Sequence, residues 1–209
     1  LSSVHKANLI QAIAQQESPI LVLTDDDQSA RRLSEDFNQM CGQECSAVYP
    51  YRDFILRPIE TVSREYEYLR LNVLSRLAKG ELKAVFAGIN AAMQYTIPKD
   101  RLLQATVSFH PGDQISLDAV VHKLIAAGYT RRPQVDGTAQ FSVRGGIVDF
   151  FPTGNLEPVR IEFWGDEIDG IEEVDPITGV TIAPFDAYKI YPANLFMTTK
   201  EATLRAIHE

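Results

Sequence analysis

The chain has 209 residues, of which 45% are hydrophobic, and this is enough to form one large domain or two smaller ones. Its formal net charge of −8 argues against a general nucleic-acid binder, because binding to phosphates requires a basic face. No apolar run approaches the ~20 residues that span a bilayer, and residues 1–16 do not resemble a secretion signal, so we expect a cytoplasmic protein with no membrane contact.

The cysteines and histidines do not predict a metal site. Cys41 and Cys45 are the two cysteines, and the four histidines are scattered along the chain. Neither residue type shows the spacing of a zinc site, so we expect two reduced thiols and no metal or other cofactor.

The first half of the chain alternates helical and strand patterns. Apolar residues at helical spacing between Ala7 and Ala14 precede an unbroken apolar run, residues 20–23, which is typical of a central strand buried on both faces. The aspartates of residues 25–27 can cap a following helix, and Gly42 stands where that helix should end.

The alternation continues to about residue 106. A helix is predicted to begin near residues 61–63 and to end at Gly80, and residues 82–87 form a second buried strand. Strands that alternate with helices form parallel sheets covered on both sides. Residues 1–106 are therefore predicted to form an α/β domain.

The pattern changes near Thr106, after which strands dominate. A short strand over residues 107–109 and a helix over 117–125 precede two runs rich in β-branched and aromatic residues, 141–151 and 159–163. Glycine and proline interrupt these runs, as tight turns require. We therefore predict a small antiparallel sheet covered by one helix.

These patterns predict two domains in one chain. An α+β domain over residues 107–190 is inserted in the α/β domain, and residues 191–209 begin the return to the first domain with a helix over 199–207. Because the chain has no initial Met and stops within that helix, we expect a fragment of a longer protein.

No phosphate-binding loop follows the first predicted strand. Such a loop is rich in glycine and ends in lysine and serine or threonine, whose amides and ammonium group neutralise phosphate. The aspartates of residues 25–27 stand there instead. They could hold magnesium at the strand end, but we favour helix capping because no phosphate cradle accompanies them. We therefore expect no catalysis.

Six carboxylates lie between Asp166 and Asp175 with no Lys or Arg among them. Like charges packed this densely can raise a pKa for acid–base catalysis. We favour a solvated edge strand and turn, because charged side chains also protect sheet edges from aggregation.

Arginines alternate with apolar residues in the second region: Arg131 and Arg132, Arg144, and Arg160. Strand side chains alternate between the two faces, so these guanidinium groups should lie on the exposed face of the sheet, with Arg144 and Arg160 on neighbouring strands. Such a face suits a specific protein interface. By pattern alone, an ordinary solvated sheet face explains the arginines slightly better.

The same region resembles a known family. Residues 141–152 (FSVRGGIVDFFP) and 159–169 (VRIEFWGDEID) resemble the UvrB-like module of bacterial nucleotide excision repair. Residues 173–179 (EVDPITG) and 190–193 (IYPA) extend the resemblance in the expected order, and the first region is weaker but colinear. The module is shared by UvrB, which verifies damage, and by the transcription-repair coupling factors (Mfd).

Two departures favour the coupling-factor branch of this family. UvrB has an intact phosphate loop and a long aromatic β-hairpin that inserts into DNA, whereas residues 49–54 (YPYRDF) lead through a short loop to the next helix. The resemblance thus implies a degenerate P-loop-type domain that binds no ATP, with an inserted domain that recruits UvrA. It also implies that the family's ATP-dependent DNA translocase motor, and its contacts with DNA and RNA polymerase, belong to domains missing from this chain.

The resemblance implies which residues contact UvrA: Arg131, Arg144, Arg160 and Glu162. UvrB has a further arginine at the position of Ser142.

The alternative function is a vestigial nucleotide or single-stranded DNA binder of a UvrB-like or helicase-like repair protein. It would use a stacking and phosphate-binding patch formed by Tyr51, Arg52, Phe54 and Arg57. The negative net charge weighs against this alternative.

Overall fold

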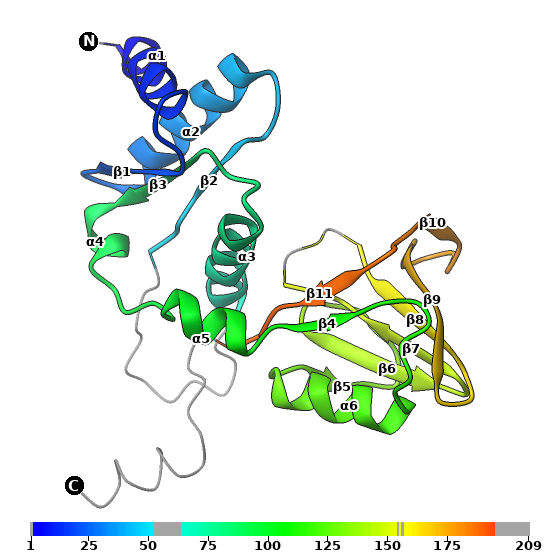
Figure 1. Ribbon diagram of the computed structural model, residues 1–209. Coiled ribbons are helices and arrows are strands. Elements are labelled where there is room, and N and C mark those ends of the chain that lie inside the picture. Colours follow the sequence, from blue (N-terminus) through cyan, green and yellow to red (C-terminus); the bar gives the residue numbers. More distant parts are fainter. Residues whose placement is uncertain (1, 52–63, 154, 156, 195–209) are drawn as a thin grey trace, which may run out of the picture.

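The computed structural model describes residues 2–51, 64–153, 155 and 157–194. Figure 1 shows an α/β unit beside a strand-rich unit, with the chain passing between them after helix α5 and returning along strand β11. The fold is thus mixed α/β, with one parallel sheet and a larger, mainly antiparallel sheet.

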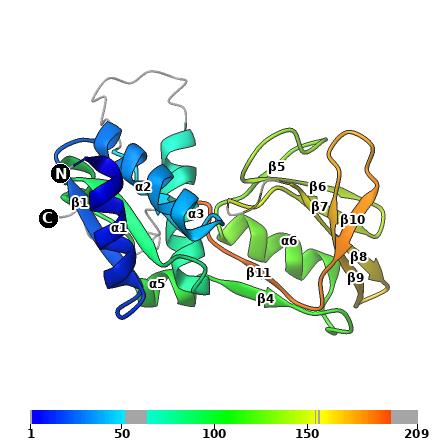
Figure 2. The same cartoon turned by 90° about the horizontal axis from the view of Figure 1, so that it is seen from above.

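The α/β unit is a three-stranded parallel sheet with helices on both faces (Figure 2). Its strands are β1 (Ile20–Thr24), β2 (Ser46–Val48) and β3 (Ala84–Gly88), in the order β1-β3-β2. Its helices are α1 (Ser3–Ala14), α2 (Asp27–Cys41), α3 (Glu65–Lys79), α4 (Ile89–Ala92) and α5 (Lys99–Gln104). Helices α1 and α2 pack on one face of the sheet, and α3 packs on the other.

Strand β3 is central in this sheet, so the expectation of a central, fully buried strand over residues 20–23 was wrong. All five residues of β3 are buried, whereas Leu21 and Leu23 of β1 are 62% and 52% exposed. Strand β1 lies at the sheet edge, and α3 packs through Val73 on Val85 of β3 instead. Both strands are unbroken apolar runs, so hydrophobicity alone could not assign the centre.

Helix α2 begins and ends as its sequence predicts. The Asp26 side chain accepts a hydrogen bond from the Ser29 N–H at 2.6 Å, which confirms the predicted cap. Gly42 ends the helix with a φ of +67°, a left-handed conformation that glycine adopts without strain.

The strand-rich unit contains one helix and eight strands among the described residues. They are β4 (Val107–Phe109), α6 (Leu117–Ala126), β5 (Thr130–Arg131), β6 (Gln140–Arg144), β7 (Ile147–Phe150), β8 (Val159–Trp164), β9 (Glu167–Val174), β10 (Thr181–Pro184) and β11 (Tyr188–Ile190). Six strands form a sheet in the order β10-β9-β8-β7-β6-β5, antiparallel except for the β5–β6 pair. Strands β4 and β11 pair separately. An antiparallel sheet with one covering helix was predicted, and the structure confirms it.

The core of this unit lies between α6 and one face of the six-stranded sheet. Val120 and Leu124 of α6 pack with Phe141, Phe150 and Ile161 of the sheet, and all five side chains are essentially inaccessible to solvent. Each such side chain contributes about 1.5 to 3 kcal/mol by leaving water. Because α6 covers only this face, the opposite face carries the polar residues of the same strands.

The acidic stretch was assigned wrongly to a sheet edge. Strand β9 pairs with both β8 and β10, so it lies inside the sheet, and β10 is the edge strand. The predicted turn is confirmed, because Asp175 organises it after β9: its Oδ1 accepts hydrogen bonds from the N–H groups of Ile177 and Thr178 at 2.9 and 2.7 Å.

Residues 191–194 connect the two units. Tyr191 packs against Leu71, Ile97 and Leu102 of the α/β unit. Ala193 belongs to the core of the strand-rich unit, and its N–H donates to the Ala127 carbonyl at 2.7 Å. The helix predicted over 199–207 and the predicted helix start near 61–63 lie outside the described residues. Within the described ranges, no helix has the length and apolar character needed to cross a membrane.

Candidate protein-docking site

The N-terminus of α2, where a nucleotide-binding domain would hold phosphate, carries carboxylates. Asp26 caps the helix, and the hydrogen bond from the Ser29 N–H lowers the pKa of its carboxyl. Asp27 accepts the Tyr51 N–H at 2.9 Å and approaches Gly88 so closely that a Cβ there would lie 2.7 Å from its Oδ1. Two negative side chains at this end of the sheet repel phosphate.

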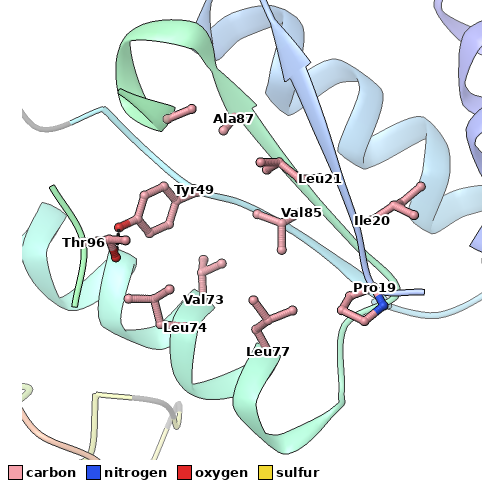
Figure 3. Close-up of a pocket in the computed structure, with 11 residues that line it drawn as sticks. Pro19, Ile20, Leu21, Tyr49, Val73, Leu74, Leu77, Val85, Ala87 and Thr96 are labelled. Atoms are coloured by element: carbon pink, nitrogen blue, oxygen red, sulfur yellow. Dashed lines mark hydrogen bonds between the residues drawn. The ribbon is translucent and has the colours of Figure 1, made fainter. Parts of the chain in front are cut away.

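An apolar cavity of about 250 Å³ lies between α3 and the sheet (Figure 3). Val73, Leu77 and Val85 are among the residues that line it, and Tyr49 donates a hydrogen bond from its hydroxyl to Thr96 Oγ1 at 2.8 Å. Among the described residues that line the cavity, none is a carboxylate, histidine, lysine or arginine. Acid–base catalysis near neutral pH has no suitable group there.

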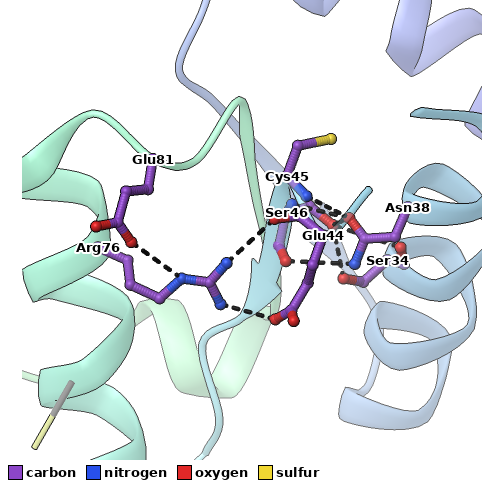
Figure 4. Close-up of polar contacts among 7 residues, drawn as sticks. All are labelled: Ser34, Asn38, Glu44, Cys45, Ser46, Arg76 and Glu81. Carbon is purple, nitrogen blue, oxygen red and sulfur yellow. Dashed lines mark hydrogen bonds and ion pairs between the residues drawn. The ribbon is translucent and has the colours of Figure 1, made fainter. Parts of the chain in front are cut away.

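The polar side chains beside β2 bind one another and nearby backbone groups (Figure 4). Asn38 Oδ1 accepts hydrogen bonds from the N–H groups of Cys45 and Ser46 at 3.0 and 2.9 Å, so these two backbone donors at the start of β2 have a partner. Strand β2 has three residues and was too short to be predicted from the sequence. Arg76 binds the Glu44 carboxylate at 2.8 Å and lies 3.6 Å from Glu81. These groups hold β2 between α2 and α3.

A cluster of charged side chains lies on the sheet face opposite α6. Register places Ser142 of β6, Asp149 of β7 and Arg160 of β8 side by side in one row. In the next row Arg144 and Glu162 flank Ile147. Alternation points these side chains away from the core face. We call Arg144, Asp149, Arg160 and Glu162 the docking cluster.

Asp149 joins the two arginines of the docking cluster. Its Oδ1 accepts from Arg160 Nε at 2.7 Å, and its Oδ2 accepts from Arg160 Nη2 at 3.2 Å and from Arg144 Nη2 at 2.8 Å. The fork of Arg160 thus binds the carboxylate through two nitrogens, a strong geometry for such a pair. The hydrogen bond to Asp149 raises the pKa of Arg160 above the ordinary value of arginine.

The two arginines differ in exposure. The side chain of Arg144 is 66% exposed, whereas that of Arg160 is 17% exposed and that of Asp149 is 10% exposed. The two arginines lie on one face of the sheet and Arg144 is exposed, as predicted, whereas the expectations that Arg160 is exposed and that the two strands are neighbours were wrong. Strand β7 lies between the strands of the two arginines, and its Asp149 binds the Arg160 side chain against the sheet.

A small hollow of about 220 Å³ lies beside the docking cluster. The turn after β9 closes one side of it, and the Gly179 carbonyl accepts a hydrogen bond from Arg160 Nη1 at 3.3 Å. Arg144 also lines this hollow, so its exposed guanidinium faces a concave and polar surface.

Trp164 was not proposed from the sequence, although it stands two and four residues after Glu162 and Arg160. The period of two places all three on the same face of β8, and Trp164 is 83% exposed. It is the one tryptophan of the chain. Tryptophan and arginine are enriched among interface hot spots.

Arg131 does not join the docking cluster. Its register partner in β6 is Phe141, whose side chain belongs to the core face, and Arg131 itself is exposed at the edge strand β5. Its assignment to the interface stays a prediction. Of the alternative DNA-binding patch, Tyr51 is exposed, and Arg52, Phe54 and Arg57 lie outside the described residues. In the described part of the chain, no group of His, Cys, Asp and Glu side chains could hold a metal ion.

Comparison with known proteins gives the docking cluster a family context. Residues 107–196 match the UvrB interaction domain. The docking cluster and Trp164 all fall within this match.

The similarity to known proteins extends over nearly the whole chain. The chain is 36% identical to the UvrABC system protein B of Bacteroides thetaiotaomicron, over 96% of its own length and 32% of that protein. It is 27% identical to the transcription-repair-coupling factor of Bacillus subtilis, over 100% of its length and 18% of that protein, and 29% identical to that of Staphylococcus aureus, over 96% and 17%. The chain is thus homologous to both proteins and spans about a third or less of each.

Proposed function

We propose that this chain is a non-catalytic docking module that recruits UvrA in transcription-coupled nucleotide excision repair. The observation that carries the proposal is the docking cluster, an organised pair of arginines on the sheet face opposite α6, within the residues that match the UvrB interaction domain.

The chemistry of the docking cluster suits a partner surface that carries charged side chains. Its two arginines and two carboxylates sum to a net charge of about zero in a chain of net charge −8, and Arg144 is the exposed positive charge among them. Arginine binds carboxylates through a planar fork, and Trp164 adds apolar area at small entropic cost. Glu162 supplies an acceptor for a cationic residue of the partner.

We assign the chain to the coupling-factor branch of the family. Sequence identity is higher to the UvrB relative, but the position of the phosphate loop is occupied by residues 25–27, three aspartates. A functional UvrB needs that loop to bind ATP. The α/β unit is then a degenerate P-loop-type scaffold, and contacts with DNA and RNA polymerase would belong to other parts of the longer protein.

Titration calorimetry with purified UvrA tests the proposal. The parent chain should bind, and Arg144→Glu should weaken binding by at least about 30-fold, because the partner's carboxylate would face a like charge at a cost of about 2 kcal/mol or more. Arg101→Glu is the matched control, since it reverses an exposed arginine of α5 in the α/β unit. If the parent chain does not bind UvrA, or if both variants bind like the parent, the proposed function is wrong.

A further inference from the structure

We propose that Asp149 is a positioning residue, which holds the guanidinium of Arg144 in the orientation that the partner binds. The binding part of this inference rests on the proposed function, whereas its structural part concerns the free chain alone.

The place of Asp149 in the sheet supports this role. It lies in β7, between the strands that carry Arg144 and Arg160, and its side chain is nearly buried. Each of its two oxygens accepts a hydrogen bond from Arg160, and Oδ2 also accepts from Arg144. One carboxylate thus fixes both guanidinium groups relative to the rigid sheet.

The three residues have different tasks in this arrangement. Arg160 uses Nε and Nη2 for Asp149 and Nη1 for the Gly179 carbonyl, so its donors are directed into the protein. It therefore fixes the carboxylate. Arg144 bonds Asp149 through Nη2 alone among the contacts of the described residues, and two thirds of its side chain stays exposed. Arg144 is the residue left to contact a partner.

Pre-ordering of Arg144 should strengthen binding. A free arginine side chain samples many rotamers, and a partner that binds it must restrict them. A planar guanidinium held at one of its nitrogens directs its other N–H donors within one plane, which a lysine ammonium cannot reproduce. The carboxylate of Asp149 therefore acts on affinity through Arg144, without touching the partner.

Side-chain NMR of the free chain tests the positioning directly. In the parent, the Nε–H group of Arg144 should show an order parameter above about 0.6, the level below which groups count as flexible. Asp149→Asn should lower it below that level, while the Nε–H of Arg101 should be the same in both proteins. An Arg144 that is flexible in the parent, or equally ordered in Asp149→Asn, would overturn the inference whether or not UvrA binds.

A double-mutant cycle then separates positioning from a merely structural role. Asp149→Asn should weaken UvrA binding by roughly tenfold in the parent, but by less than about twofold in an Arg144→Ala background, because its effect passes through Arg144. Equal losses in both backgrounds contradict the inference. An absence of binding by the parent would refute the proposed function and leave the NMR result as the test of positioning.

A second variant covers the case in which Asp149→Asn does not fold. Arg144→Lys keeps the charge at an exposed position but removes the planar fork. It should lose as much affinity for UvrA as Arg144→Ala, within about twofold. Parent-like affinity of Arg144→Lys would show that orientation by Asp149 is unimportant and would overturn the inference.

Discussion

Reversal of charge at Arg160 should destabilise the fold, whereas the same change at Arg144 should not. Arg160 is only 17% exposed and binds Asp149 through two nitrogens, so Arg160→Glu places a second carboxylate against a nearly buried one. Arg144 is 66% exposed, and its ion pair is screened by water.

The magnitudes separate the two variants clearly. Breaking a buried ion pair by removing one partner costs about 3 to 5 kcal/mol, because the remaining charge is left without compensation. Loss of a surface pair costs below about 1 kcal/mol. With a dependence on urea of about 2 kcal/mol per molar, the midpoint of unfolding should fall by about 1.5 to 2.5 M for Arg160→Glu and by less than about 0.5 M for Arg144→Glu.

Urea titrations followed by circular dichroism measure both midpoints in the same buffer. The double variant Asp149→Asn with Arg160→Gln is the control, since it removes both charges and should recover part of the loss. If Arg160→Glu unfolds at the same urea concentration as the parent, Asp149 and Arg160 do not form a partly buried pair, and the description of the docking cluster is wrong.

Three further predictions concern two buried tyrosines, Trp164 and the N-terminus of α2. Burial raises the pKa of Tyr129 and Tyr188 above that of tyrosine in the unfolded chain, so the stability that their neutral forms contribute is complete below about pH 10 and is lost as the pH rises further. Tyr188→Phe should therefore reduce the fall of the melting temperature at alkaline pH, and an unchanged fall would contradict this reasoning. Trp164→Ala should weaken UvrA binding at least about fivefold with an unchanged melting temperature, because its side chain is 83% exposed, and calorimetry that finds parent-like affinity would exclude it from the interface. Millimolar ATP with magnesium should not raise the melting temperature, because Asp26 and Asp27 occupy the phosphate end of α2, and a reproducible rise would show that the site still binds nucleotide.

The sequence predicted the elements with strong periodicity. Helix α2 and its Asp26 cap follow from local chemistry, and the antiparallel sheet follows from β-branched runs separated by glycine turns. The face that carries Arg144 and Arg160 followed from the period of two alone.

Strand order and contacts across strands could not be predicted. Runs 20–23 and 84–87 are both apolar, and only tertiary packing places β3 at the centre. The role of Asp149 could not be predicted for a similar reason. It stands between apolar residues of β7, and its role appears when register brings it beside Arg160, a partner eleven residues away. Spacing along one strand contains no information about such a neighbour.

Amide NMR of the isotope-labelled chain, recorded with and without UvrA, tests the central claim most directly. The account predicts that signals of β6, β7 and β8 near Arg144, Asp149 and Trp164 lose intensity first, while those of α6 on the opposite face and of α2 in the α/β unit do not. Intensity loss centred on the α/β unit, or an unchanged spectrum at saturating UvrA, would contradict a docking surface on this face of the sheet.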